Sequence, residues 1–366
     1  MKVKKTRLTF KILSLIICTA CLLSSVILLG SCKKKGENAS GTPDLEYKLN
    51  SAGTEYSVTG YTGNKDEITV PEKYNDIPVV AVADSAFKGN TTIKTVTLPG
   101  SVTSIGDEAF AKCTALETVN FPAKISTLGY GCFQNCSSLK SVKIPEGVDK
   151  LPVALFDGCS ALTSVELPAS LSVISFVSFI GCDNLMELKV AEGNTTYHSN
   201  GNCIIKTEEK TLVIGAGSSV IPTDGSVVTI GENAFYGKKQ LSTIAFPECV
   251  KLIEQYAFYG CSSLRYARLT GVTAIEDGAF NGCTSLRYVV FPTSLNSIGD
   301  IVFSKCVSLN NVYYLGTDTE WKTVSIDSTT LSQLENVSIY YYSATEPETE
   351  GNYWYYSGTN IVQWKK

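Results

Sequence analysis

Phenylalanine returns along this chain at almost every twenty-third position. The nine members of this column are Phe87, Phe110, Phe133, Phe156, Phe179, Phe235, Phe258, Phe280 and Phe303, with one step shorter by a single position and one long step between Phe179 and Phe235. An apolar residue stands five positions before and six positions after each of them. One such unit cannot bury its own apolar face, but a stack of similar units can. The chain is therefore predicted to wind into a solenoid of coils.

Each unit contains a stretch that alternates like a short β-strand. In the unit of Phe280, Leu286 is followed by the apolar residues Val289 and Phe291, and Pro292 closes the stretch. Side chains of a strand alternate between its two faces, and proline cannot donate to a sheet. Glycine occupies the position two residues after the phenylalanine in six units: Gly89, Gly158, Gly181, Gly237, Gly260 and Gly282. A left-handed backbone turn is predicted at this column.

The segment from Ala279 to Pro292 reads Ala-Phe-Asn-Gly-Cys-Thr-Ser-Leu-Arg-Tyr-Val-Val-Phe-Pro. The consensus of the units, Ile/Leu-Gly-x-x-Ala-Phe-x-Gly-Cys-x-Ser-Leu-x-x-Val-x-Leu-Pro, resembles the BspA-like class of bacterial leucine-rich repeats from Glu46 to about Tyr342. The resemblance implies a leucine-rich-repeat solenoid of the α/β type, in which short parallel strands alternate with turns or short helices. It also implies a surface-exposed protein, often used for adhesion, without fixing the ligand.

The long step between Phe179 and Phe235 holds an insertion at about residues 191–222. Cys203 to Lys206 and Thr211 to Ile214 are expected to form a β-hairpin that protrudes from the continuing stack, and Val220-Ile221-Pro222 is expected to end a degenerate strand. The other predicted segments are an N-terminal cap with an irregular first coil at 46–81, leucine-rich repeats at 82–315, a C-terminal cap at 316–342, and a linker with an aromatic tail at 343–366.

Segment 1–31 has the composition of a secretory signal. Five basic residues precede Ile12, and the stretch from Ile12 to Gly30 is almost wholly apolar. Leu29-Gly30-Ser31-Cys32 resembles the lipobox of bacterial lipoproteins, which implies that Cys32 carries a lipid anchor and becomes the mature N-terminus. An uncleaved membrane anchor is the alternative, since about 19 apolar residues nearly span a bilayer. Both interpretations place the remainder, beginning with a flexible tether at 32–45, outside the cytoplasm at the membrane of a bacterial cell surface.

The charge of the remainder argues against nucleic acid as a partner. The whole chain has a formal charge of −4, and removal of the five basic residues of the signal leaves −9. Binding to phosphates needs a basic face, which this balance does not supply. The predicted partners are therefore a protein or glycan ligand and, through the lipid, the membrane.

Seven cysteines share one column, three positions after the phenylalanine: Cys113, Cys136, Cys159, Cys182, Cys261, Cys283 and Cys306. Neighbouring coils lie within disulfide distance, but equivalent side chains in a solenoid point the same way, so the bridging dihedral is not available. The column is therefore predicted to fill the core with free thiols. A metal ladder or redox sensing is the alternative. Beyond the signal, however, the chain has no Cys-x-x-Cys pair and one histidine only, so neither a metal nor a cofactor is expected.

His198 lies five residues before Cys203 in the insertion, which raises the alternative of a thiol–imidazole pair. A solvated histidine in a polar loop explains the same residues, and no Gly-x-Ser-x-Gly elbow or phosphate-binding glycine loop appears. The chain is therefore not expected to be an enzyme, and a thiol-dependent enzyme or redox protein is the weakest of the functions considered.

A surface patch on the predicted concave sheet is the better candidate for a functional site. Its outward-facing members are Tyr266, Arg268, Tyr288, Val290 and Tyr313, with Arg265 and Arg287 beside them, whereas early coils have small or polar residues at these positions. Tyrosine and arginine are enriched in binding hot spots, although cross-strand tyrosines can also merely stabilise a sheet. The predicted function is non-catalytic recognition or adhesion through this concave face. A self-associating structural component of the envelope is the alternative.

Overall fold

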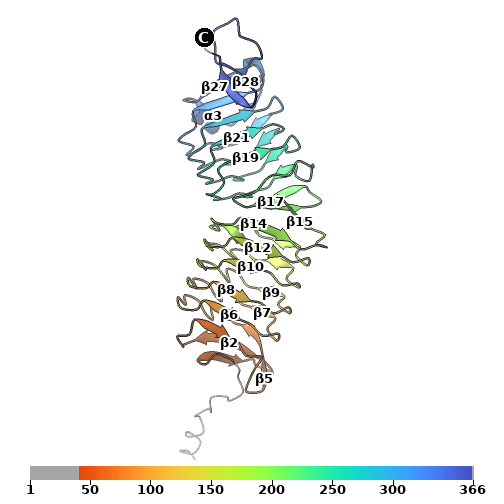
Figure 1. The fold of residues 1–366 in the computed structure, drawn as a ribbon, viewed down its shortest axis with the longest axis vertical. Coiled ribbons are helices and arrows are strands. Elements are labelled where there is room, and N and C mark those ends of the chain that lie inside the picture. Colours follow the sequence, from red (N-terminus) through yellow and green to blue (C-terminus); the bar gives the residue numbers. More distant parts are fainter. Residues whose placement is uncertain (1–40, 365–366) are drawn as a thin grey trace, which may run out of the picture.

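The computed structural model describes residues 41–364, which wind into an elongated stack of coils (Figure 1). Each coil has three sides, which we name the front wall, the side wall and the Phe turn. In one coil, β21 (Tyr266–Leu269) belongs to the front wall, β22 (Ala274–Ile275) belongs to the side wall, and the turn around Phe280 closes the path to the next coil. The predicted solenoid of repeating coils is confirmed.

The front wall consists of short parallel strands, one from each coil. Its strands are β3 (Glu67–Thr69), β6 (Thr95–Thr97), β8 (Thr118–Asn120), β10 (Ser141–Lys143), β12 (Ser164–Leu167), β14 (Glu187–Val190), β19 (Ile244–Phe246), β21, β23 (Tyr288–Phe291), β25 (Asn311–Tyr314) and β27 (Ser338–Tyr342). Residues one repeat apart pair directly, as Val142 does with Val165. These are the strands that the alternating stretch of each unit predicts.

The side wall is a second parallel sheet, which the repeat pattern does not predict as strands. Most of its strands have two residues: β7 (Ser104–Ile105), β9 (Thr127–Leu128), β11 (Lys150–Leu151), β13 (Val173–Ile174), β18 (Thr229–Ile230), β20 (Leu252–Ile253), β22, β24 (Ser297–Ile298) and β26 (Ser325–Ile326). Two residues are too few to display a strand alternation. At the N-terminal end, β1 (Leu45–Leu49), β2 (Tyr56–Tyr61), β4 (Lys73–Tyr74) and the longer β5 (Ile77–Val82) form the first, irregular coils.

The Phe turns bring the phenylalanine rings of successive coils face to face in the core. The ring centroids of Phe235 and Phe258 are 4.9 Å apart, and those of Phe258 and Phe280 are 5.2 Å apart. The predicted left-handed column is confirmed, for example at Gly89 with a φ of 76°. A second column of residues with left-handed backbone angles lies two residues before the phenylalanine. It contains residues other than glycine, for example Glu108 and Ala154. Within residues 41–364 the only helical Phe turn is the 3₁₀ turn η1 (Phe176–Phe179).

The predicted β-hairpin in the insertion forms, but it is part of the side wall, so the prediction that it protrudes from the stack is wrong. Strands β15 (Tyr197–Asn200), β16 (Cys203–Lys206) and β17 (Thr211–Gly215) pair in antiparallel fashion, and β17 then pairs in parallel with β18. A β-bulge separates Ile204 from Ile205, and both side chains are fully buried. Because the bulge turns both apolar side chains toward the core, the hairpin is stabilised by packing into the stack and is not exposed to solvent as a protruding arm would be.

The insertion interrupts the stack on its other two sides. Leu212 of β17 pairs with Ile230 of β18, a shorter step along the chain than one regular coil, because this coil lacks a Phe turn. The predicted strand at Val220-Ile221-Pro222 does not form, and the front wall is interrupted between β14 and β19. The buried apolar residues inside the coils accordingly divide into two large clusters that meet at the insertion, and a third, small cluster lies under the C-terminal hairpin.

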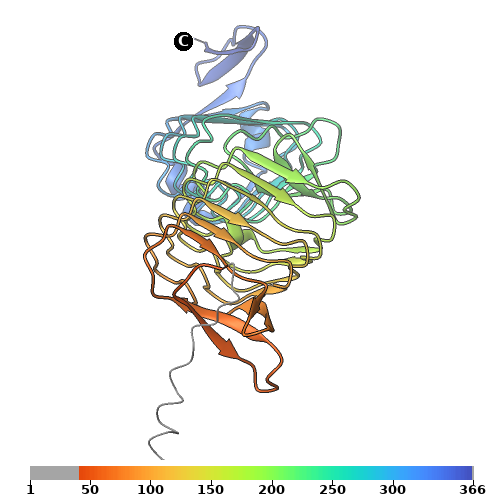
Figure 2. The same cartoon turned by 60° about the horizontal axis from the view of Figure 1, so that its bottom comes forward.

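The segment predicted to be the C-terminal cap contains α2 (Asp318–Trp321), β26, α3 (Ser328–Leu334) and β27. Trp321 is buried against the ring of Phe291, at a centroid distance of 5.8 Å. The following aromatic tail is folded: β28 (Tyr353–Ser357) pairs with β27, and β29 (Asn360–Gln363) pairs with β28. Figure 2 shows this C-terminal hairpin outside the coils at the C-terminal end of the stack.

The predicted signal and Cys32 lie outside the described residues, as does most of the predicted tether. At the N-terminal end of the described residues, the backbone amide of Thr42 donates to the carbonyl of Thr69 at 2.8 Å. The last residues before β1 therefore follow the edge of β3. Among residues 41–364, no helix has the length and apolar character needed to cross a membrane.

Candidate functional site

The thiol column lies in the core, next to the Phe turns. All seven of its cysteines are free and buried. Each thiol donates to the carbonyl of the phenylalanine one coil earlier: Cys113 to Phe87, Cys136 to Phe110, Cys159 to Phe133, Cys182 to Phe156, Cys261 to Phe235, Cys283 to Phe258 and Cys306 to Phe280, at 3.0 to 3.2 Å. The column therefore links successive Phe turns, which is a role that the prediction of simple core filling did not include.

Burial also sets the chemistry of these thiols. It raises the pKa of Cys113, Cys182, Cys261 and Cys306 to about 12, and it also raises the pKa of Cys136, Cys159 and Cys283 well above the ordinary value of a thiol. The thiolate is the nucleophilic and metal-binding form of cysteine. Thiols that stay protonated at physiological pH have little of either reactivity, which supports a structural role for the column.

Lys238 takes the place of cysteine in the unit of Phe235. Its side chain is 3% exposed, and Nζ donates to the carbonyl of Phe179 at 3.1 Å, across the whole insertion. This is the bond that a thiol makes elsewhere in the column. Because the intervening coil has no Phe turn, the longer lysine side chain links the two halves of the stack at this point. Lys239 reinforces the junction through an ion pair with Asp183 at 2.8 Å.

Lys238 is expected to make stability depend on pH in a way that Lys238→Met abolishes. Burial lowers the pKa of the Lys238 ammonium group, and the neighbouring Cys182, Cys261 and Asp183 offset the shift only in part. Between that lowered pKa and the ordinary lysine value of about 10.4, the unfolded chain binds more protons than the folded one. The contribution of Lys238 to stability therefore rises with pH in this window. The free energy of unfolding of the wild type, relative to that of Lys238→Met, should rise by up to about 1.4 kcal/mol per pH unit. Urea unfolding from about pH 6 to about pH 9 measures this difference.

Lys239→Met is the matched control, because the neighbouring lysine is exposed and its replacement should leave the pH dependence unchanged. A constant difference between wild type and Lys238→Met over the whole range would show that Lys238 does not resist protonation in the folded protein.

The two residues of the alternative thiol–imidazole pair have other partners. Nδ1 of His198 lies 3.0 Å from Oγ1 of Thr207, and the buried thiol of Cys203 lies 3.5 Å from the carbonyl oxygen of Gly201. Burial raises the pKa of Cys203 to about 11. The arrangement does not provide an activated nucleophile.

The predicted surface patch divides into an open part and a covered part. Tyr266 and Tyr288 are half-buried on the front wall, with stacked rings 5.4 Å apart, and Arg265 and Arg287 are exposed beside them. Nη2 of Arg268 donates to the carbonyl of Thr359 at the tip of the C-terminal hairpin, at 2.9 Å. The patch thus contacts a segment 91 residues away in sequence.

Val290 and Tyr313 are not exposed as predicted, because the C-terminal hairpin covers them. They are 2% and 6% exposed and pack with the fully buried Trp354. Nε1 of Trp354 donates to the carbonyl of Tyr314 at 3.0 Å, and the amide of Gln363 donates to the hydroxyl of Tyr313 at 2.9 Å. These two patch members hold the hairpin against the front wall.

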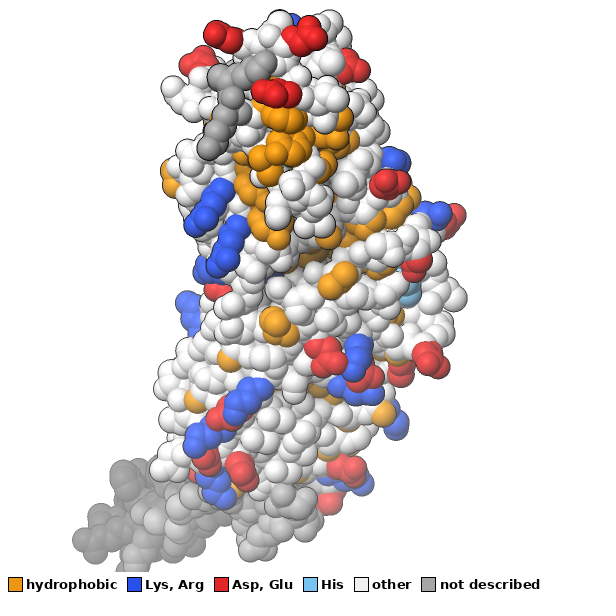
Figure 3. All heavy atoms as spheres, turned by 45° about the horizontal axis from the view of Figure 1, so that its top comes forward, with side chains coloured by type: hydrophobic (Ala, Val, Ile, Leu, Met, Phe, Trp, Pro, Cys, Tyr) orange, Lys and Arg blue, Asp and Glu red, His pale blue; other side chains and the backbone are white. Residues whose placement is uncertain are grey.

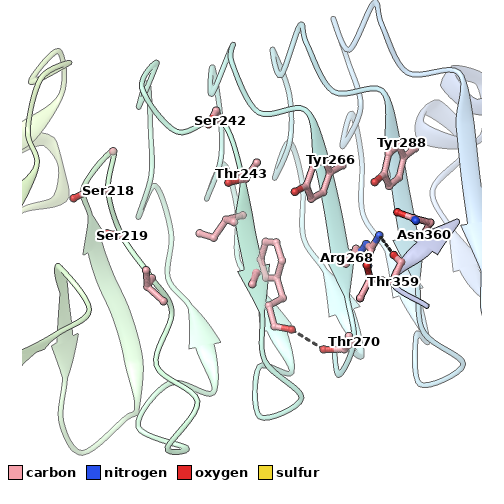
Figure 4. A pocket seen from close by; sticks show the side chains of 15 residues that line it. Ser218, Ser219, Ser242, Thr243, Tyr266, Arg268, Thr270, Tyr288, Thr359 and Asn360 are labelled. Carbon is pink, nitrogen blue, oxygen red and sulfur yellow. Dashed lines mark hydrogen bonds between the residues drawn. The ribbon is translucent and has the colours of Figure 1, made fainter. Parts of the chain in front are cut away.

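An open groove remains on the front wall between the hairpin tip and the insertion (Figure 4). Its volume is about 860 Å³. It is lined by Ser242, Thr243 and Ala245 on and beside β19, by Tyr266, Arg268 and Tyr288 on the following coils, by Gly217 to Val220 of the insertion, and by Thr359 with Asn360 of the hairpin. The groove lies where the front wall is interrupted, so the insertion and the hairpin together flank it.

Sequence reasoning found Tyr266, Arg268 and Tyr288 but missed the residues from the insertion and the hairpin. The repeat columns give the position of the first three. Val220 and Asn360 belong to no column, so only the tertiary structure brings them to the groove. The tryptophans of the tail were a usable signal, because a polar linker does not need two large aromatic residues.

The two halves of the molecule present different surfaces. On the face shown in Figure 3, hydrophobic side chains gather over the C-terminal half, and charged side chains of both signs are interspersed over the N-terminal half. On the early front wall these charges are paired between coils, as in Lys94 with Asp66 at 3.1 Å and Lys143 with Glu166 at 2.5 Å. Exposed ion pairs of this kind contribute little to stability. Charges that are already paired with each other are also less available to bind a ligand.

A model of the BspA type leucine rich repeat region matches residues 80–203 and 217–337 in six copies. The match breaks off within the insertion, at β16 and β17. Among solved structures, a leucine-rich repeat protein from Eubacterium ventriosum has 21% identity and a TM-score of 0.56, with 76% of this chain and 78% of that chain covered. The pneumococcal vaccine antigen PcpA has 16% identity and a TM-score of 0.54, with 85% and 95% covered. At these identities the likeness concerns the fold alone.

A leucine rich cell surface protein from Faecalibacterium prausnitzii is 25% identical over 79% of this chain and 98% of that chain, with a TM-score of 0.43. No protein with a curated description matches the chain. The repeat model, in contrast, covers more than half of the sequence and coincides with the coils of the structure on both sides of the insertion. The chain therefore belongs to the BspA-type leucine-rich repeat family.

Proposed function

We propose that this protein is a non-catalytic recognition or adhesion protein of the bacterial cell surface, which binds a protein or glycan ligand in the front-wall groove. One observation carries the proposal: Tyr266, Arg268 and Tyr288 converge with the hairpin tip around a single groove of about 860 Å³. Sites for small ligands typically have volumes of about 300–1,000 Å³ and a few convergent polar groups. Membership of a surface-associated repeat family and the inert core thiols agree with recognition more than with catalysis.

The proposal includes a lipid on Cys32 that anchors the chain outside the cytoplasm. The apolar stretch and the Leu-Gly-Ser-Cys sequence support it. In the described residues, the chain enters the stack at β1, at the end of the molecule remote from β28 (Figure 1). A protein anchored through its N-terminus would therefore present the groove on the half that lies away from the membrane.

The test is binding of the purified chain from Lys33 onward to an array of host matrix proteins, mucins and glycans. A variant combining Tyr266→Ala, Arg268→Ala and Tyr288→Ala should lose binding by well over tenfold, because residues of this type at the centre of an interface each contribute about 2 kcal/mol or more. Thr118→Ala with Asn120→Ala is the matched control, since both residues are exposed at equivalent positions of β8. Circular dichroism verifies that every variant is folded.

Equal binding by the triple variant would place recognition elsewhere on the molecule. If no member of the array binds, and the purified chain self-associates with rising concentration in sizing experiments, the protein is better explained as a structural component of the envelope.

A further inference from the structure

The groove offers hydrogen-bonding groups that the protein itself does not use. Within the described residues, the side chains of Ser242, Thr243, Thr359 and Asn360 form no hydrogen bond, and all four residues are exposed. Each hydroxyl can donate one hydrogen bond and accept two, and the amide of Asn360 can both donate and accept. A ligand that fills the groove therefore meets several neutral donors and acceptors spread over its length.

The ring of Tyr266 presents an aromatic face at one side of these groups. The tyrosine column of the front wall begins at Tyr266: Tyr288 in the next coil stacks on one face of its ring, at 5.4 Å, and the equivalent position in the preceding coil is Thr243. The step from threonine to tyrosine leaves the other face of Tyr266 without an aromatic neighbour among the described residues. In Figure 4, Thr243 and Tyr266 stand next to each other along the groove.

The electrostatics of the groove favour an uncharged ligand. Among residues 41–364, no acidic side chain lines it, and its only charged residue is Arg268. Nη2 of Arg268 already donates to the carbonyl of Thr359, the guanidinium lies 5.8 Å from the ring centre of Tyr356, and Nε is buried without a hydrogen-bond partner. Because Nη2 holds the hairpin tip and Nε is shielded from the groove by its burial, Arg268 is poorly placed to bind a carboxylate or phosphate in the bidentate manner.

The groove is poorly suited to a peptide ligand. Strands β21 and β23 are paired on both sides, and β19, the edge strand of this part of the wall, offers an extended peptide a free edge of only three residues, Ile244–Phe246. The apolar members Ile244 and Phe246 are buried beneath the surface, which leaves Val220 as the one large aliphatic side chain exposed in the described lining. A peptide anchored by apolar side chains finds no pocket of that kind here.

We propose that the groove binds a neutral oligosaccharide, with the apolar face of one sugar ring on Tyr266 and ring hydroxyls on Thr243, Thr359 and Asn360. This rests on the proposed function and narrows its ligand class to sugars. A pyranose ring combines an apolar C–H face with a rim of hydroxyls, which is the combination that the groove presents. Pairing through neutral groups also means that binding should depend little on salt.

The test uses the chain from Lys33 onward on an array of neutral glycans, acidic glycans and unglycosylated matrix proteins, followed by calorimetric titration with the best-bound soluble glycan. Tyr266→Ala should weaken binding at least about tenfold, and Tyr266→Phe should change it little, because the ring is kept. Thr243→Ala and Asn360→Ala should each weaken it severalfold. Two matched controls should bind like the wild type: Thr118→Ala on β8, and Tyr259→Ala, whose ring stacks on Tyr236 in the Phe turns.

Binding of a neutral glycan that follows this order of variants and is insensitive to salt supports the proposal. Capture of an unglycosylated protein through the same residues would overturn the sugar and leave the proposed function standing. Binding confined to acidic glycans and weakened by salt would overturn the neutral ligand. Binding that Tyr266→Ala leaves unchanged would overturn the site, and no binding to any member of the array would overturn both proposals.

Discussion

The free energy of unfolding is expected to fall by on the order of 10 kcal/mol between pH 8.5 and pH 9.5, enough to unfold the solenoid. The cause is the set of nine buried thiols whose pKa burial raises: Cys113, Cys132, Cys136, Cys159, Cys182, Cys203, Cys261, Cys283 and Cys306. In the unfolded chain each of them ionises near its ordinary pKa of about 8.5.

The sign follows from proton linkage. Where the folded pKa is raised, the folded protein keeps a proton that the unfolded chain releases, so stability is fully present below pH 8.5 and is lost as pH rises. One pH unit above that value, each thiol removes about 1.4 kcal/mol. The loss continues toward the folded pKa values of about 11 for Cys203 and about 12 for Cys113. Lys238 acts in the opposite direction, but it is one group against nine thiols. The sum is comparable with the whole stability of an ordinary domain, about 5–15 kcal/mol.

Urea unfolding under reducing conditions, repeated from about pH 7.5 to about pH 9.5, measures this slope. In a variant with serine at positions 136, 159, 261 and 283, the hydroxyls can still donate to the phenylalanine carbonyls but do not ionise in this range. The loss of stability over this range should decrease by about 1.4 kcal/mol for each thiol removed. A stability that stays flat to pH 9.5, or a slope unchanged by the serines, would show that these thiols are not shielded from ionisation.

The parts of the fold that repeat could be predicted from the sequence. Phe258, Gly260, Cys261 and Leu264 each belong to a column, so every unit gives independent evidence for the same position. The columns indicate which side chains face the core, and they place Tyr266 and Tyr288 on neighbouring strands from the spacing alone. The same argument predicted free thiols, because equivalent side chains in stacked coils are parallel.

The parts of the fold that occur once could not be predicted in this way. Arg268 and Thr359 meet across 91 residues, and Lys238 and Phe179 meet across 59 residues. Neither Thr359 nor Val220 has a repeat column that fixes its orientation. The exposure of Val290 and Tyr313 was consequently predicted from their strand positions alone, and the prediction was wrong because another segment covers them. The part of the groove that the insertion and the hairpin supply depends on contacts that occur only once in the fold.

Trp354→Ala is expected to detach the C-terminal hairpin from the front wall while the coils stay folded. Trp354 is fully buried, donates Nε1 to the carbonyl of Tyr314, and packs against the rings of Tyr313 and Tyr356 at 5.4 and 4.7 Å. Replacing a buried tryptophan by alanine costs about 3–5 kcal/mol. Because the hairpin contacts one face of the wall, we expect this cost to fall on its local opening. Amide hydrogen exchange in β28 and β29 should accelerate by about 100- to 5,000-fold, with β19 and β22 unchanged.

Trp364→Ala is the matched control, because this second tryptophan of the tail is only half-buried and donates to the carbonyl of Ser343, outside the front wall. Its replacement should accelerate exchange far less. The variant also separates two roles of the hairpin. If Trp354→Ala abolishes ligand binding while the coils keep their protection, the hairpin tip is a wall of the groove. If binding becomes stronger, the hairpin instead competes with the ligand for Tyr288 and Tyr313. Faster exchange that spreads into β21 and β23 would contradict local opening, because the hairpin would then be part of the cooperative stack.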